Sequence, residues 1–307
     1  MSGHIISLQP IQRVSIDLVA ELLGRAFAGY LAPLSRDSFS PRTLEATVAR
    51  DDVLLDRSYV AVLNDTPVGV ALVAVRSARR GPRTRLAGMG VVPESRRMGV
   101  ARALLERVVS DARGRGSPTV VLEAFARNTA AVRLYEGHGF VATRRLLGFT
   151  LAMEDPGAAA SPATGLPAVT LHPTDAPALL PLFSLCASAE PAETAPSWQV
   201  EASSLARLGP SAVVYILAER GSIRPAGYVA LAGDGPTARL VGLGVAPARR
   251  RQGLASAALA ALRETRPDVV ALSVAPLVPA QSALVPFLEM RGAVPAGEAQ
   301  LEMVARL

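Results

Sequence analysis

The sequence has no lysine, so all of its positive charge comes from arginine: the 32 basic residues are Arg, against 26 Asp and Glu. The resulting net charge of +6 would suit a protein that binds nucleic acid. Such proteins also interleave aromatic side chains with the basic ones, and aromatic residues make up only 4% of this chain. We therefore do not expect nucleic acid as a partner.

Cysteine is almost as scarce, since Cys186 is the only one. A single cysteine excludes an intramolecular disulfide framework and a cysteine-rich zinc site, and we expect no metal. No apolar run approaches the roughly 18–20 residues that span a bilayer. The first residues also lack the basic and apolar regions of a secretion signal. We therefore expect a cytoplasmic protein with no membrane partner.

The sequence does contain an internal repeat. Residues 86–101 and 240–255 share two glycines, a Val-x-Pro, two arginines and a final Gly-x-Ala. A period of half the chain indicates two homologous domains, because solenoid repeats are far shorter. The stretch 155–167 between the copies is rich in small residues and is punctuated by Pro and Gly, which is typical of a linker. We place the domains at 1–154 and 168–307.

Each half shows the same order of expected elements, read from apolar periodicity and from turn and cap residues. In the first half these are helices over 14–28 and 42–51, strands over 58–63, 68–76 and 85–92, a helix over 100–114, a strand over 119–125, a helix over 129–138 and a strand over 140–152. The second half repeats this course and ends in a strand. The pattern predicts a mixed α/β fold, with a mixed sheet flanked by helices, built twice.

The turn before the helix 100–114 is the most informative stretch. A glycine-containing turn that leads into a helix presents unpaired backbone N–H groups and the positive end of the helix dipole, a combination that binds phosphate. Gly99 and Ala101 would let phosphates approach the backbone closely, and Arg96 and Arg97 add positive charge. The alternative is a plain strand–turn–helix junction, and the second copy in the other half argues against it.

Two stretches resemble the signatures of a known family, the GNAT acetyltransferases. Arg-x-x-Gly-x-Ala over 96–101 is similar to that family's acetyl-CoA pyrophosphate signature. The stretch 122–140, in which a strand is followed by Asn128, Tyr135 and a Gly-Phe pair, is similar to its second signature. The resemblance implies two tandem GNAT-like acyl-CoA acyltransferase domains that use acetyl-CoA as co-substrate.

The resemblance also implies a role for each matched residue. The backbone of Met89 and Val91 would pair with the pantetheine arm, and Asn128 would contact that arm or fix the following helix. Tyr135 would protonate the leaving thiolate, and Glu123 would be the base that takes a proton from the amine. The residues implied for the pyrophosphate are Arg96, Arg97, Met98, Gly99, Val100 and Ala101.

Some of these residues have a simpler alternative. A lone Glu on a strand is commonly a solvated residue, so Glu123 could have no chemical role. Asp37 and Glu45, in the early helical region, are the other candidates for the base. Tyr135 could be a helix residue that packs on the last strand. Asn128 could be the N-cap of the helix that follows it, which is compatible with a cofactor contact.

The second half keeps the first signature but not the second. Its candidate cofactor residues are Leu243, Val245, Arg250, Arg251, Gln252, Gly253, Leu254 and Ala255. Leu288 stands opposite Tyr135, Gln281 opposite Asn128, and no carboxylate stands opposite Glu123. We therefore expect the first domain to be catalytic. The second would either bind acetyl-CoA without catalysing or bind nothing.

Charge divides unevenly between the halves. Residues 1–154 hold 21 Arg against 14 Asp and Glu, a balance of +7, whereas residues 155–307 hold 11 Arg against 12, a balance of −1. The excess therefore accompanies the phosphate-binding turn of the candidate catalytic domain. It is dense at Arg76, Arg79, Arg80, Arg83 and Arg85, which either recognise an acidic substrate or are solvated, and we favour the second interpretation.

The function that we expect is transfer of an acetyl group from acetyl-CoA to a primary amine, by direct attack in a ternary complex. The amine could belong to a small molecule, an amino acid or a peptide N-terminus. The alternatives are an acetyltransferase similar to mycothiol synthase and a non-catalytic acetyl-CoA sensor. The chain would work as a monomer or a homodimer.

Overall fold

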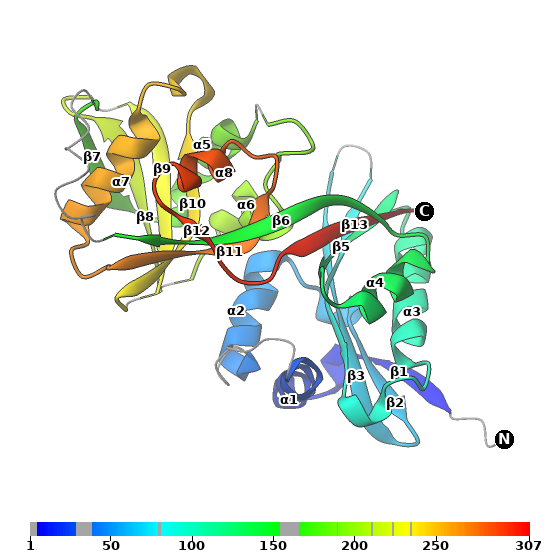
Figure 1. The fold of residues 1–307 in the computed structure, drawn as a ribbon. Helices are drawn as coiled ribbons and strands as arrows, with labels where there is room; N and C mark the ends of the chain where they lie inside the picture. The colour runs from blue at the N-terminus through cyan, green and yellow to red at the C-terminus, as the bar shows by residue number, and fades with distance from the viewer. Residues whose placement is uncertain are drawn as a thin grey trace. The chain divides into compact units, whose positions relative to one another are not determined.

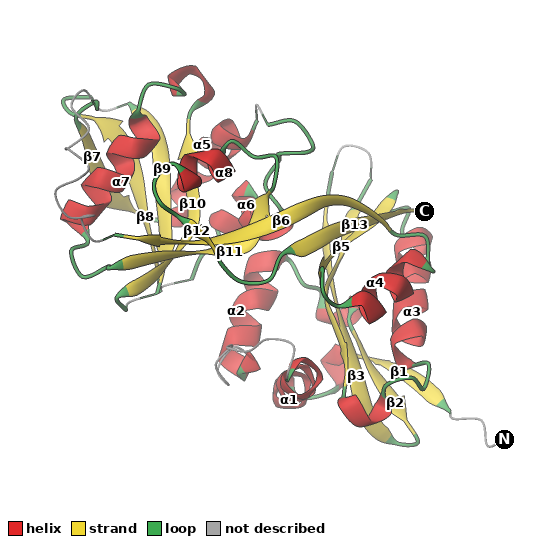
Figure 2. Cartoon of the chain, viewed as in Figure 1, coloured by secondary structure: helices red, strands yellow, loops and turns green. Residues whose placement is uncertain are grey.

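The computed structural model describes residues 5–28, 39–78, 81–153, 166–188, 190–209, 211–222, 224–233 and 235–307. Asp37, Arg79 and Arg80, named above, lie outside these ranges. The chain divides into two compact units: unit 1 is Met1–Thr143 with Leu301–Leu307, and unit 2 is Arg144–Gln300. Each has a mixed sheet with helices packed on it (Figures 1 and 2), which confirms the predicted fold class.

Unit 1 is built on a sheet in the order β1-β2-β3-β4-β5-β13. The first four strands are antiparallel to one another, and β4 and β5 are parallel. The strands are β1 (Ile6–Pro10), β2 (Tyr59–Leu63), β3 (Thr66–Arg76), β4 (Arg83–Val91), β5 (Thr119–Phe125) and β13 (Gln300–Arg306). The helices are α1 (Ile16–Phe27), α2 (Pro41–Asp51), α3 (Val100–Gly114) and α4 (Thr129–Glu136).

Helices α1 and α3 both pack against β3 and β4, and they do so from opposite faces of the sheet. Gly90 on β4 lies against Ala26 of α1, whereas Gly69 on β3 lies against Val100 of α3. Serine side chains begin the two early helices: Ser15 caps α1 and Ser40 caps α2. The core is therefore a sheet covered on both faces, with the end of β4 held between two helices.

Unit 2 repeats this plan in the order β7-β8-β9-β10-β11-β6, with β12 also paired to β6. The strands are β6 (Val141–Ala152), β7 (Val169–Thr174), β8 (Ala212–Glu219), β9 (Pro225–Ala232), β10 (Thr237–Val245), β11 (Ala271–Pro279) and β12 (Val294–Pro295). The helices are α5 (Leu180–Ala187), α6 (Ala202–Leu205), α7 (Leu254–Thr265) and α8 (Leu284–Glu289).

The last strand of each half belongs to the other unit. Strand β6 comes from the first half, yet it pairs antiparallel with β11, and Phe149 and Leu151 lie in the hydrophobic core of unit 2. Strand β13 comes from the second half and lies beside β5 of unit 1. The compact units therefore differ from the expected halves 1–154 and 168–307 in these two strands. The alternation of apolar and polar residues identifies a strand in a sequence, but it does not show which sheet the strand joins.

In the described ranges, none of the helices combines the length and the apolar character needed to cross a membrane.

Candidate functional site

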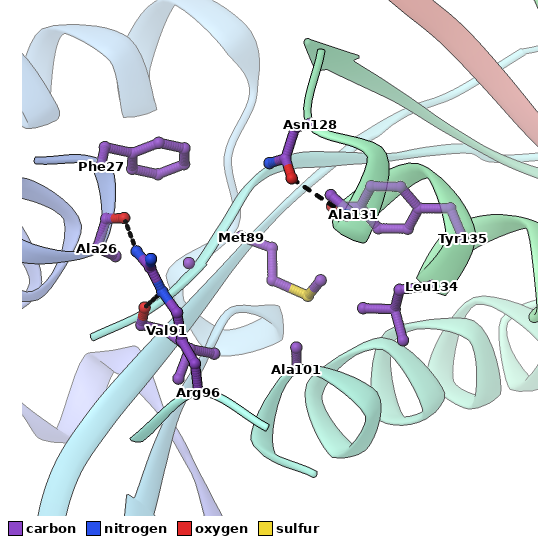
Figure 3. A pocket seen from close by; sticks show the side chains of 11 residues that line it. Ala26, Phe27, Met89, Val91, Arg96, Ala101, Asn128, Ala131, Leu134 and Tyr135 are labelled. Carbon is purple, nitrogen blue, oxygen red and sulfur yellow. Dashed lines mark hydrogen bonds between the residues drawn. The ribbon is translucent and has the colours of Figure 1, made fainter. Parts of the chain in front are cut away.

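A groove in unit 1 lies where the end of β4 meets the first turn of α3, the last turn of α1 and helix α4. Its cavity has a volume of about 140 Å³. Figure 3 shows the Met89 side chain extending into it between Ala101 and Leu134, with Asn128 and Tyr135 on the side formed by α4. The lining residues are Ala26, Phe27, Met89, Gly90, Val91, Arg96, Ala101, Asn128, Ala131, Leu134 and Tyr135.

The turn between Arg96 and Ala101, two residues that line the groove, has two residues in the left-handed conformation. Arg97 has φ 66° and Gly99 has φ 86°. A side chain is strained at such angles, so glycine suits the second position. Gly99 immediately precedes α3 and has no side chain with which to cap it. The first N–H groups of α3 therefore stay available to a ligand or solvent, with the positive end of the helix dipole behind them.

Arg96 lines the groove, and its side chain also holds two elements together. Its Nη2 donates to the carbonyl of Ala26 at 2.9 Å, and its Nε donates to the carbonyl of Val91 at 3.3 Å (Figure 3). These bonds join the last turn of α1 to the end of β4. The guanidinium is thus fixed by backbone oxygens, and Arg96 shapes the wall of the groove.

Asn128 caps helix α4. Its Oδ1 accepts a hydrogen bond from the backbone N–H of Ala131 at 3.2 Å (Figure 3), which satisfies a donor that the start of a helix leaves unpaired. The N-cap expectation is confirmed. The same side chain lines the groove, so the cap holds Asn128 in place there.

Tyr135 is the titratable side chain of α4 that reaches the groove. It is buried, and its ring lies 5.8 Å from the ring of Phe140, centroid to centroid. Burial raises the pKa of the Tyr135 phenol well above its ordinary value of 10, because the phenolate would lose its hydration. The hydroxyl is therefore fully protonated at neutral pH and can donate a proton or a hydrogen bond.

Glu123 lies on β5 but is not among the residues that line the groove. Its Oε2 accepts hydrogen bonds from Nε and Nη2 of Arg85 at 2.9 and 2.8 Å, and both side chains are 4% exposed. Nη1 of Arg85 lies 3.6 Å from Oδ2 of Asp51, the last residue of α2. Glu123 is therefore part of a buried ion-pair cluster and is not a solvated residue. Glu45, the other described candidate base, is exposed on α2.

The arginines near β3 and β4 correct one expectation. We favoured solvated side chains, but Arg85 is 3% exposed and ion-paired with Glu123. Arg76 is also shielded and lies 2.7 Å from Asp52. Arg83 is exposed as expected. These pairs could not be predicted from the sequence, because the carboxylates come from the C-terminal end of α2 and from β5, which are distant along the chain.

The groove brings together six of the residues expected from the sequence: Met89, Val91, Arg96, Ala101, Asn128 and Tyr135. Of the others in the turn, Met98 is partly exposed and Val100 is buried in the core. Sequence reasoning missed Ala26 and Phe27, because only the packing of α1 on β4 brings them to the groove. It also missed Leu134, although this residue adjoins Tyr135 in the second signature.

Unit 2 has the same turn in the same conformation. Arg251 has φ 64° and Gly253 has φ 76°. Arg250 donates to the carbonyls of Val245 and Cys186, at 3.2 and 2.6 Å, as Arg96 does in unit 1. Gln252 accepts a hydrogen bond from Arg249.

The surroundings of this second turn differ from those of the first. Nη1 of Arg250 lies 2.8 Å from a carboxylate oxygen of Glu190. A methyl group added at Gly253 would lie 3.2 Å from Leu166 and from Pro167. Leu288, which stands opposite Tyr135 when the two halves are compared, is fully buried in the core of unit 2. Gln281, which stands opposite Asn128, is exposed. Leu243 and Val245 pack against that core and Leu254 is part of it.

The family model of the acetyltransferase (GNAT) family matches residues 21–140 and 177–275, which together make up more than half of the chain. The chain therefore belongs to the acetyltransferase (GNAT) family. The two matched regions fall one in each half, which confirms the tandem arrangement predicted from the repeat.

Curated relatives match parts of the chain. N-alpha-acetyltransferase 30 of Schizosaccharomyces pombe is 33% identical over 96 residues, which is 31% of this chain and 63% of the relative. The [Ribosomal protein bS18]-alanine N-acetyltransferase of Escherichia coli (strain K12) is 44% identical over 55 residues, which is 18% of this chain and 37% of the relative. The matches thus span less than two thirds of the length of either relative.

Solved structures match the whole chain. A GCN5-related N-acetyltransferase from Sphaerobacter thermophilus has a TM-score of 0.66 at 16% identity, covering 100% of this chain and 96% of that one. A tandem GNAT protein from the clavulanic acid biosynthesis pathway has a TM-score of 0.69 at 17% identity, covering 98% of both chains. At these identities the likeness concerns the fold.

Proposed function

We propose that unit 1 transfers an acetyl group from acetyl-CoA to a primary amine. The observation that carries this proposal is the groove itself. Arg96 and Ala101, which flank the turn suited to phosphate, line it together with the buried protonated phenol of Tyr135. The end of β4 also lines it. A polyanionic nucleotide that is joined to a thioester by an extended arm would fit a groove with a phosphate-binding turn, a strand end and a phenol.

The groove residues would hold acetyl-CoA in three places. Backbone N–H groups at the start of α3 would bind the pyrophosphate. The backbone of Met89 and Val91 would pair with the pantetheine arm as an added strand would. The amide of Asn128 lines the same groove and would hydrogen-bond the arm. When bound, acetyl-CoA supplies the thioester that the amine attacks.

The roles of the protein's own groups follow from the chemistry of the step. The amine nitrogen attacks the thioester carbonyl carbon, the C–S bond breaks, and the sulfur leaves as a thiolate. Tyr135 would donate its phenolic proton to that sulfur, because its raised pKa keeps it protonated. Much of the rate would come from holding the amine and the thioester together.

The proton lost by the amine needs an acceptor. An alkyl amine has a pKa of about 10.4, so it is mostly protonated at neutral pH and is not nucleophilic. We keep Glu123 as the proposed base. Since Glu123 does not line the groove, we expect the proton to reach it through water.

The acceptor class that we favour includes the N-terminal amine of a protein or peptide. By name, one of the curated relatives above is an N-alpha-acetyltransferase and the other acetylates an alanine of a ribosomal protein. The match to the Escherichia coli enzyme is short, so we extend the proposal to primary amines of small molecules and amino acids. Unit 2, with Leu288 in place of a tyrosine, would not catalyse the transfer.

The proposal is tested by measuring release of CoA thiol from acetyl-CoA in the presence of short peptides with free N-termini and of small amines. We expect release that depends on the amine, and mass spectrometry should show the amine 42 Da heavier, the mass of an added acetyl group. Acetyl-CoA that binds but is not consumed with any amine of the panel would contradict the proposed activity and support the sensor alternative.

A further inference from the structure

Strand β13 reaches unit 1 only after the chain has passed through the whole of unit 2. It lies next to β5, and the backbone N–H of Leu307 donates to the carbonyl of Pro118, just before β5 begins, at 3.1 Å. The hydroxyl of Thr143 donates to the carbonyl of Glu302 at 3.1 Å. The segment Leu301–Leu307 is therefore hydrogen-bonded to unit 1 at both of its ends.

The side chains of β13 fit an interior position. Met303 is 0% exposed and Ala305 is 2% exposed, whereas Arg306 is exposed. Without this strand, β5, which carries Glu123, would be the edge of its sheet. Its outer N–H and C=O groups would then be unpaired. A sheet edge of this kind accepts an extended segment by backbone pairing, and its apolar side chains set the register.

Strand β6 makes the reciprocal connection. Leu151 pairs with Leu272 and Phe149 with Val274 of β11, and both β6 side chains are buried in the core of unit 2. On its other edge, Thr150 pairs with Val294 of β12. The first half thus supplies an interior strand of unit 2, and the second half supplies β13 to unit 1.

We propose that the edge of β5 is a docking site whose occupant is the chain's own segment Leu301–Leu307, and that this strand makes unit 1 depend on the second half. The second half would then be required for acetyl transfer although it lacks the second signature. Its contribution is β13, which covers the edge of β5 in the sheet on which the groove is built. The exchange also makes neither half a self-sufficient folding unit.

The first test cuts the folded full chain at a protease site engineered between Met153 and Leu166. The exchanged strands should keep the two fragments together, so they should elute as one particle of the uncut mass and separate only in denaturant. Fragments that separate in native buffer and stay folded would overturn the proposal. Because the readout is mass, the result does not depend on whether acetyl-CoA is the co-substrate.

A matched pair of variants shows whether β13 provides this attachment. Met303→Asp places a carboxylate at a fully buried position of β13, whereas Val270→Asp makes the same kind of change at a position that is 41% exposed in unit 2. In the cut protein, Met303→Asp should raise the dissociation constant of the fragments at least tenfold, and Val270→Asp should leave it unchanged. Equal dissociation constants would overturn the proposal.

A third measurement supplies the strand from outside. A chain ending at Gln300 should bind a fluorescent peptide with the sequence of residues 300–307 saturably, and should not bind the same residues in scrambled order. A chain ending at Gln300 that keeps the thermal stability of the full chain and ignores the peptide would contradict the proposal. If that chain does not fold by itself, co-expressing it with the peptide fused to a carrier should restore soluble protein, and failure to do so would count against the proposal.

Discussion

The turns at 96–99 and 250–253 have nearly the same backbone, but the residues around them differ between the two units. Both place an arginine and a glycine in the left-handed region, and both use the preceding arginine to join a helix end to a strand end. What differs is the residue on the later helix, which is Tyr135 in one unit and Leu288 in the other. The turn alone therefore does not indicate catalysis. The two units are distinguished by the residue on the later helix, which carries a phenol only in unit 1.

The largest expected difference between the units comes from placing a charge on each turn. Gly99→Glu should reduce acetyl-CoA binding and turnover more than a hundredfold, because a carboxylate would occupy the place of a phosphate. The equivalent Gly253→Glu should leave turnover unchanged. Isothermal titration with acetyl-CoA and the thiol-release assay measure both.

Backbone strain has to be separated from charge in that experiment. Gly99→Ala imposes the strain of a positive φ without the charge, and we expect it to retain most of the binding. Equal losses for the alanine and glutamate variants would show that strain, and not phosphate repulsion, is the cause. Loss of turnover in Gly253→Glu would contradict the assignment of catalysis to unit 1 alone.

The next effect concerns stability and the buried ion pairs of unit 1. Arg85→Ala leaves the carboxylate of Glu123 buried without its partner, whereas Asp51 keeps its ion pair with Arg50, so the free energy of unfolding should fall by about 3–5 kcal/mol. In unit 2 the Arg249–Glu219 pair is at the surface, and Arg249→Ala should cause no resolvable change. Urea unfolding followed by circular dichroism compares the two, and equal effects would contradict the distinction.

A smaller effect is expected at the proposed acid. Tyr135→Phe removes only a hydroxyl, so acetyl-CoA affinity should change less than twofold while kcat falls about a hundredfold. The reciprocal Leu288→Tyr should bring no activity to unit 2 in a Gly99→Glu background, since Gln281 and the missing carboxylate are unchanged. An unaltered kcat for Tyr135→Phe would remove Tyr135 from the mechanism.

The smallest effect is in the pH dependence. The pKa of Tyr135 is raised by burial above its ordinary value of 10, so the proton that it donates stays in place through neutral and moderately alkaline pH. We therefore expect kcat not to decline between pH 7 and about 9.5. A fall in kcat in that interval, absent in Tyr135→Phe, would show a phenol of lower pKa than its burial implies.

The same raised pKa has a consequence for stability. The folded state holds the Tyr135 proton more tightly than the unfolded chain, so this contribution to stability is complete below pH 10 and is lost as pH rises further. Above pH 10 the unfolding free energy should therefore drop more steeply for the native chain than for Tyr135→Phe.

Much of the site could be predicted from the sequence because its parts are local. The turn 96–101 and the segment 128–135 are short stretches whose conformation depends on their own residues, and the structure brings them to one groove. The contribution of Phe27 and the engagement of Glu123 by Arg85 could not be predicted. Both depend on packing between elements that lie far apart in the chain.

The elements were easier to predict than their partners. The helix expected over 100–114 is α3, with the same ends, and the strand expected over 119–125 is β5. Strands β1 and β7 were missed, although Ile6–Pro10 and Val169–Thr174 begin with alternating apolar and polar residues, because each is short and ends at or next to a proline. The units to which β6 and β13 belong could not be predicted, since the apolar pattern of a strand does not identify the strand beside it.

The position of β13 sets an order of events during synthesis. Residues 301–307 are made after every strand of unit 2, so the ribosome releases nearly all of unit 1 while its sheet still ends at β5. Domains usually fold as they emerge, the N-terminal one first. In this chain the N-terminal unit reaches its final sheet only after the second half has been translated, and until then the edge of β5 is open to chaperones or to neighbouring nascent chains.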